Sequence, residues 1–146
     1  MNKDPYIISE NMFDVGDGHR LYVQEWGNPD ASTTTIFLHG GPGGQIRDKH
    51  KGAFDPKTQH VIFFDQRGCG RSTPYGSLEN NDTNKLIEDI SKIADAFNIK
   101  TFVLHGSSWG STLALAYALA HPERVYALVI GGIFTGSKAE IDWIGT

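Results

Sequence analysis

Short, strongly apolar segments recur along the chain and are the main indication of its fold. They are rich in β-branched and aromatic residues and are bounded by glycine, proline or asparagine, as strands usually are. We predict strands at residues 20–26, 33–38, 61–64, 101–104 and 125–130. The segment 61–64 is apolar at every position, which is typical of strands buried on both faces of a parallel sheet.

Two other segments carry the apolar spacing of a helix. In residues 82–97 the apolar side chains share one stripe, while most charged side chains lie away from it. Asp82 or Thr83 can cap the N-terminus of this helix. The segment from residue 109 or 110 to 120 is mostly leucine and alanine, and Pro122 follows where a helix cannot continue. Alternating strands and helices predict an α/β fold, with a mostly parallel sheet flanked by helices.

Composition and charge narrow the classes of protein. A length of 146 residues suits one domain, and a net charge of −4 argues against nucleic acid or an anionic membrane as a partner. A single cysteine, Cys69, excludes an internal disulfide. Because the sequence also has no secretory signal and no apolar run long enough to span a bilayer, we expect a cytoplasmic protein. The 17 glycines are clustered, which indicates tight loops at a few places.

One glycine cluster, Gly106-Ser107-Ser108-Trp109-Gly110, matches the pattern G-x-S-x-G. In this motif a strand turns sharply into a helix, and the central serine is held in a strained conformation with its hydroxyl exposed. The spacing selects Ser108 as the candidate nucleophile. We expect both flanking positions to require glycine, because side chains there would clash with neighbouring backbone. The alternative is an ordinary strand-to-helix turn in which the serine only caps the helix.

A second cluster, His39-Gly40-Gly41-Pro42-Gly43-Gly44, follows a predicted strand. Backbone N–H groups in a glycine loop can stabilise the negative charge that develops on oxygen during acyl transfer. We assign one donor to Gly41 and the other to Trp109, the residue after the candidate nucleophile. The alternative is a tight turn that binds no ligand.

The third cluster spans residues 65–72 and ends another strand. Asp65 could be catalytic, but we favour a structural role in which Asp65 and Arg67 pair and hold neighbouring loops. Nothing nearby marks Cys69 as an activated nucleophile. The glycines do not fit nucleotide-binding patterns, and the histidines lack the spacing of metal ligands, so neither a nucleotide nor a metal is expected.

Together these blocks resemble the proline iminopeptidase (prolyl aminopeptidase) family, serine peptidases with the α/β-hydrolase fold. The matching segments are residues 14–19, 38–44, 64–72, 77–81, 108–117, 121–125, 132–134 and 140–143. The resemblance implies release of an N-terminal proline from peptides without a cofactor. Ser108 would attack the prolyl carbonyl, the amides of Gly41 and Trp109 would hold the oxyanion, and water would hydrolyse the acyl-enzyme. The family usually has Gly-Gly before the nucleophile, whereas this chain has Gly106-Ser107, which adds a side chain in a crowded turn.

The catalytic triad of this fold follows the order Ser, acid, His, and the sequence lacks its last member. No histidine follows His121, and Asp142 is not at the end of a predicted strand. We therefore expect residues 1–146 to be the N-terminal portion of a single catalytic domain. The resemblance implies that the family's cap domain and last core strands would follow residue 146. Such a chain would be essentially inactive alone, and its strand at 125–130 would form an exposed apolar edge. Two alternatives stay open: another incomplete α/β hydrolase, such as an esterase or amidase, and a non-enzymatic short form that folds alone or with a complementary chain.

Overall fold

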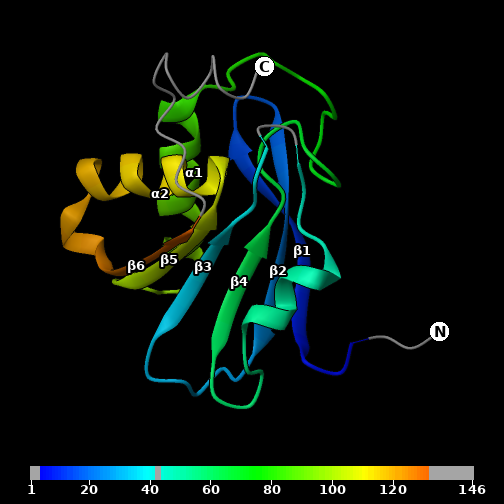
Figure 1. The fold of residues 1–146 in the computed structure, drawn as a ribbon. Coiled ribbons are helices and arrows are strands. Elements are labelled where there is room, and N and C mark those ends of the chain that lie inside the picture. The colour runs from blue at the N-terminus through cyan, green and yellow to red at the C-terminus, as the bar shows by residue number, and fades with distance from the viewer. Residues whose placement is uncertain (1–3, 42–43, 132–146) are drawn as a thin grey trace, which may run out of the picture.

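The computed structural model describes residues 4–41 and 44–131 (Figure 1). Along the chain, its elements are β1 (Ile7–Gly16), β2 (His19–Gly27), β3 (Thr34–Leu38), η1 (Asp48–Ala53), β4 (His60–Phe64), α1 (Thr83–Ala96), β5 (Phe102–Ser107), α2 (Trp109–Ala120), η2 (Pro122–Arg124) and β6 (Val125–Gly131). The two η elements are short 3₁₀ helices.

All six strands form one sheet, in the order β1-β2-β4-β3-β5-β6. The pairs β1–β2 and β2–β4 are antiparallel, whereas β4, β3, β5 and β6 run parallel to one another. The sheet is therefore mostly parallel, as predicted, with an antiparallel N-terminal edge. In the parallel part the carboxyl ends of neighbouring strands share one edge of the sheet, where ligands bind in open α/β folds. The loops after β4, β3 and β5 meet at this edge.

Both faces of the central sheet are covered, which explains the uninterrupted apolar strands. Successive side chains of a strand point to opposite faces. Ile36 and Leu38 of β3 pack in the cluster that includes residues of α1 and α2. Phe37, between them, packs in a second cluster with Phe63 and Phe54. This cluster lies on the opposite face of the sheet, next to η1 (Figure 1). No helix among the described residues is long and apolar enough to cross a membrane.

Every strand and helix predicted above is present, although some ends differ. Strand β5 continues past residue 104 to Ser107, because its ladders with β3 and β6 extend into the G-x-S-x-G motif. Strand β1 was not predicted. Its ten residues mix polar with apolar side chains and are mostly exposed, so they form no apolar run. An antiparallel ladder with β2 holds it in place.

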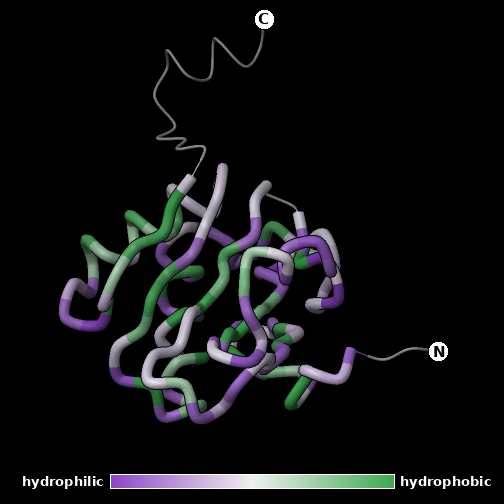
Figure 2. The backbone as a smooth tube through the Cα atoms, turned by 60° about the horizontal axis from the view of Figure 1, so that its bottom comes forward, coloured by the Kyte–Doolittle hydropathy of each residue, from purple (hydrophilic) through white to green (hydrophobic). Residues whose placement is uncertain are grey.

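Strand β6 lies at the outer edge of the described sheet, and most of its side chains are exposed. Tyr126 is 70% exposed and Val129 is 48% exposed, although both belong to a strongly apolar segment. Figure 2 shows this hydrophobic strand along one outer side of the backbone. The described residues thus contain the exposed apolar edge that the sequence predicts.

Candidate active site

The predicted strand–turn–helix is formed, with Ser108 at its apex. Strand β5 ends at Ser107, helix α2 begins at Trp109, and Ser108 between them has φ 55° and ψ −125°. A positive φ is uncommon for any residue other than glycine, and such strain concentrates at functional sites. The Ser108 side chain is exposed, and its amide donates to the Gly131 carbonyl at 3.2 Å. The strained conformation is confirmed; the role of nucleophile stays a prediction.

The two flanking glycines are required for close approach of backbone, as predicted. A Cβ on Gly106 would lie 2.4 Å from the carbonyl oxygen of Gly110. A Cβ on Gly110 would lie 2.1 Å from the carbonyl oxygen of Leu38. Ser107, where the family usually has glycine, is exposed, so its side chain does not enter the crowded turn.

The glycine loop after β3 begins beside this turn. Strands β3 and β5 are parallel neighbours, and Leu38 lies opposite Gly106, so both chains leave the sheet at the same level. A Cβ on Gly40 would lie 3.7 Å from the Cβ of Ser108. Gly41 has φ 134°, a conformation that favours glycine. Pro42 and Gly43 lie outside the described residues, so the loop is placed through Gly41 and again from Gly44.

His39 orients the first peptide groups of this loop. Its ring is fully buried, and its Nε2 must accept the hydrogen bond of the Gln66 N–H, at 3.0 Å. The proton of the neutral ring therefore sits on Nδ1, which donates to the Gly40 carbonyl at 2.8 Å. Burial lowers the pKa of His39, which favours this neutral form. Because the C=O and N–H of a trans peptide point in opposite directions, the Gly41 N–H points away from the His39 ring.

Asp65 holds loops together but does not pair with Arg67, so that part of our interpretation is wrong. Its buried carboxylate accepts from the N–H of Ile46 at 2.8 Å and from the N–H of Arg71 at 2.9 Å. The Nε of Arg71 lies 3.6 Å from the same carboxylate. Gly70 passes so close that its Cβ would overlap the Asp65 carboxylate, at 2.4 Å. Asp65 therefore ties the end of the glycine loop to the loop after β4.

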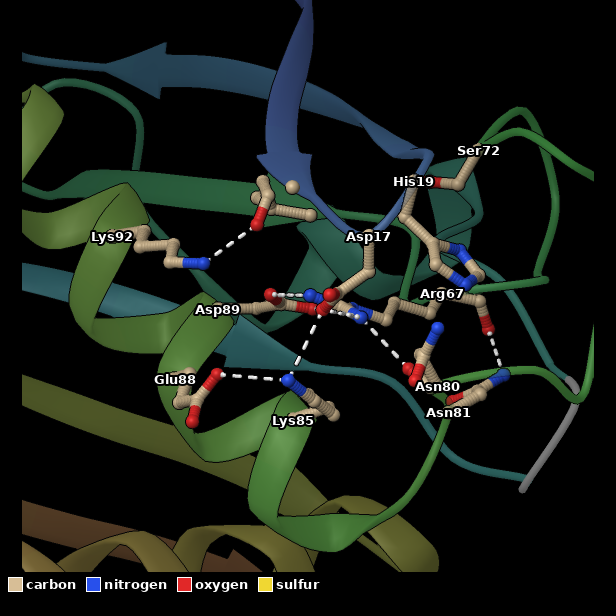
Figure 3. A network of polar contacts seen from close by, with 12 residues as sticks. Asp17, His19, Arg67, Ser72, Asn80, Asn81, Lys85, Glu88, Asp89 and Lys92 are labelled. Carbon is tan, nitrogen blue, oxygen red and sulfur yellow. Dashed lines mark hydrogen bonds and ion pairs between the residues drawn. The ribbon is translucent and has the colours of Figure 1, made fainter.

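Arg67 instead forms a buried network with α1 and the β1–β2 turn (Figure 3). Its Nε and Nη2 donate to the two carboxylate oxygens of Asp89 at 2.7 and 2.8 Å. Its Nη1 donates to Asp17 at 3.1 Å and to the Asn80 carbonyl at 2.7 Å. Both Arg67 and Asp89 have fully buried side chains. The sequence pattern missed this pair because Asp89 lies 22 residues further along the chain.

Sequence reasoning also missed Gln66, which is almost fully buried. It lies between the glycine loop and the turn at residues 106–110, called the elbow below. Its side-chain Nε2 donates to the His39 carbonyl at 3.1 Å. Its Oε1 accepts from the indole Nε1–H of Trp109, also at 3.1 Å. No sequence motif singles out this glutamine; only its place between Asp65 and Arg67 could have drawn attention to it.

No described residue supplies a general base to Ser108. Its hydroxyl makes no hydrogen bond within residues 4–41 and 44–131. His121 lies at the opposite end of α2, roughly 20 Å away at 1.5 Å per residue. His39 has both ring nitrogens occupied, and Asp142 lies outside the described residues. In the part of the chain that the structure covers, no group of three metal-ligating side chains is arranged to hold an ion.

A cavity of ≈ 450 Å³ lies beside the elbow. Its walls come from the loop after β4, the segment before α1, the first turn of α1 and the side chain of Trp109. Leu86 and the buried Cys69 are part of its largely apolar lining. The site thus combines an exposed strained serine and a neighbouring glycine loop with a cavity that Trp109, the residue after Ser108, helps to line.

Comparison with known proteins agrees with this geometry. Residues 34–143 match the family described as the alpha/beta hydrolase fold. The chain belongs to this family. Among curated alpha/beta hydrolases, it is 46% identical over 140 residues to the proline iminopeptidase of Arabidopsis thaliana, which covers 96% of this chain and 36% of that protein. It is 48% identical over 136 residues to the Xylella fastidiosa (strain Temecula1) proline iminopeptidase, covering 93% of this chain and 43% of that protein. The chain thus spans less than half the length of these relatives.

Solved alpha/beta hydrolase structures match with similar coverage. The proline iminopeptidase-related protein of Thermus thermophilus has a TM-score of 0.74 and 29% identity, over 84% of this chain and 43% of that chain. Epoxide hydrolase A of Mycobacterium thermoresistibile has a TM-score of 0.71 and 28% identity, over 84% of this chain and 38% of that chain. Proteins named for different reactions thus match about equally well, so backbone similarity establishes the fold and leaves the reaction to the site.

Proposed function

We propose that residues 1–146 are the N-terminal portion of a serine-type aminopeptidase that releases N-terminal proline from peptides. The observation that carries the proposal is the strained Ser108 turn with the glycine loop beside it. The relatives named proline iminopeptidase, at 46% and 48% identity, supply the substrate class. The cap domain and the last core strands of such an enzyme would come from further chain.

In this mechanism the Ser108 oxygen bonds to the prolyl carbonyl carbon, while a base takes the hydroxyl proton. The carbonyl oxygen becomes negatively charged and accepts hydrogen bonds from the amides of Gly41 and Trp109. The C–N bond then breaks, and the leaving amine takes up the proton. Water attacks the resulting ester, releasing proline and regenerating Ser108. The cavity beside Trp109 gives room for part of the substrate.

The base and its orienting acid are needed before Ser108 can react at a useful rate, since an unassisted serine is a weak nucleophile. Removing the serine or histidine of a triad costs about 10⁶-fold in turnover, equivalent to roughly 8 kcal/mol. We therefore propose that residues 1–146 alone are essentially inactive. An acid and a histidine from further chain would complete the site.

The test compares the chain alone with a chimera in which the unmatched C-terminal part of the Xylella fastidiosa relative follows residue 146. We expect the chimera to release proline from a prolyl anilide, and the chain alone to match its Ser108→Ala variant. In the chimera, Ser108→Ala should lower turnover by about 10⁶-fold. Activity of the chain alone well above its Ser108→Ala control would refute the proposed inactivity.

A second candidate is another alpha/beta hydrolase acting on esters or amides, because the chain shares its fold with proteins of other named activities, such as an epoxide hydrolase. The same chimera distinguishes the two candidates. A clear preference for short acyl esters over the prolyl anilide would support the second. The C-terminal part of the chimera comes from a proline iminopeptidase. The chimera's ratio of ester to prolyl anilide turnover is therefore compared with the same ratio for the intact Xylella protein.

A further inference from the structure

The side chain of Gln66 joins the two segments that carry the proposed oxyanion donors. Its Nε2 donates to the carbonyl of His39, two residues before Gly41. Its Oε1 accepts from the indole N–H of Trp109, whose backbone N–H is the other proposed donor. One planar amide thus spans from the loop after β3 to the first residue of α2.

The backbone of Gln66 strengthens the first of these attachments. Its N–H donates to Nε2 of His39 and so fixes the ring that holds the Gly40 carbonyl. Gln66 therefore contacts His39 at both the ring and the carbonyl. The preceding residue, Asp65, holds the other end of the glycine loop through the N–H of Ile46. Asp65 and Gln66, the first two residues after β4, thus contact the chain on both sides of the glycine loop.

A buried amide that makes two hydrogen bonds to different segments restricts the distance between them. An oxyanion site works only when its donors lie 2.7–3.1 Å from the developing charge, so small displacements of one donor are costly. Gln66 is 2% exposed, and no water competes easily for its bonds. Its contacts reach the donors through His39 and Trp109, so it would act through these residues rather than on the substrate.

We propose that Gln66 is a positioning residue that sets the spacing between the Gly41 and Trp109 amides. This inference rests on the proposed function, because it concerns the oxyanion site of that reaction. It applies to any acyl transfer at Ser108, whether the substrate is a prolyl amide or an ester. A purely structural role would instead stabilise the fold without affecting turnover.

The test uses Gln66→Met in the chimera described above. We expect kcat to fall about 10–100-fold, because one or both donors move from their places, while KM changes little. Trp109→Phe keeps the backbone N–H but removes the indole bond, and it should also lower kcat. The double variant should be no worse than Gln66→Met alone, because both changes break the same connection. Additive losses would overturn the proposal.

Gln24→Met is the matched control. Gln24 is also a buried glutamine, at 4% exposure, and bonds to Tyr22 on β2. We expect this variant to lose stability but to keep kcat. Equal kcat for Gln66→Met and the unmodified chimera, or an equal fall for Gln24→Met, would overturn the positioning role.

A spectroscopic readout separates this inference from the proposed function. In the chain itself, the indole N–H resonance of Trp109, assigned by its loss in Trp109→Phe, should shift in Gln66→Met and stay in place in Gln24→Met. If the chimera hydrolyses only esters, the proposed substrate fails and ester kcat tests Gln66. If it hydrolyses neither substrate, the proposed function fails, and the positioning role of Gln66 in that reaction fails with it. An unshifted indole resonance would overturn the connection itself.

Discussion

At the scale of single residues, the missing side chain of Gly110 decides how closely α2 can approach the sheet. In Gly110→Ala the new Cβ would lie 2.1 Å from the carbonyl oxygen of Leu38, a backbone atom that cannot rotate away. Overpacking of this kind costs about 1–3 kcal/mol. We expect the free energy of unfolding, measured by urea denaturation of the chain, to fall by about that amount.

Gly52→Ala is the control for this substitution. No heavy atom lies within 4 Å of a Cβ at Gly52, and its φ lies outside the left-handed region. Its effect should stay within about 0.5 kcal/mol, as for most surface substitutions. Equal losses in the two variants would contradict the close-approach argument.

The elbow residues could be predicted because their constraints are local. Five consecutive residues define the Ser108 turn. Gly106 approaches Gly110 within that turn, whereas Gly110 approaches Leu38 of β3, a partner that the motif does not reveal. The partner of Arg67 and the role of Gln66 could not be predicted this way. Their side-chain contacts join residues 22 and 43 positions apart, and a single sequence carries no sign of such pairings.

At the scale of elements, the two edge strands of the sheet differ in the polarity of their exposed side chains. Strand β1 mixes polar and apolar residues and was missed in the sequence, because tertiary pairing with β2 determines it. Strand β6 was predicted because it is apolar throughout, but in the described sheet it is exposed. An apolar edge with unpaired backbone groups is a template for association.

We therefore expect the chain to associate as its concentration rises, through β6. Val129→Lys places a charge on this edge, and charged edge strands resist pairing. The concentration at which half the chain is associated should rise about tenfold, equivalent to ~1.4 kcal/mol. Sedimentation velocity over a concentration series measures this shift.

Leu78→Lys provides the comparison for the charge itself. Leu78 is 88% exposed and lies in the segment before α1, outside the sheet. If Leu78→Lys suppresses association as strongly as Val129→Lys, the net charge of the chain controls association and the β6 edge does not.

At the scale of the whole molecule, the Arg67 network joins helix α1 to the loop after β4 and to the β1–β2 turn. Arg67 follows β4, Asp89 belongs to α1, and Asp17 lies in the turn between β1 and β2 (Figure 3). The segment before α1 joins the network through the Asn80 carbonyl. This segment also lines the cavity beside the elbow, so the network supports the walls of the site as well as the fold.

Replacing Arg67 alone should lower the free energy of unfolding far more than replacing Arg67 and Asp89 together. In Arg67→Met the Asp89 carboxylate stays fully buried without its counter-charge, and such a loss costs about 3–5 kcal/mol. In Arg67→Met/Asp89→Leu no charge is left unpaired between these positions, so most of the lost stability should return. Urea unfolding of both variants measures the difference.

Lys85→Met separates the buried pair from the partly exposed ones around it. Lys85 lies 3.2 Å from Asp17, and both side chains are about a third exposed. Ion pairs between solvent-accessible side chains contribute little to stability, so this variant should lose far less stability than Arg67→Met. If Lys85→Met loses as much stability as Arg67→Met, the partly exposed charges of Lys85 and Asp17 would account for the loss. The double variant would then stay as unstable as Arg67→Met. Both results would contradict the explanation by burial of the Arg67–Asp89 pair.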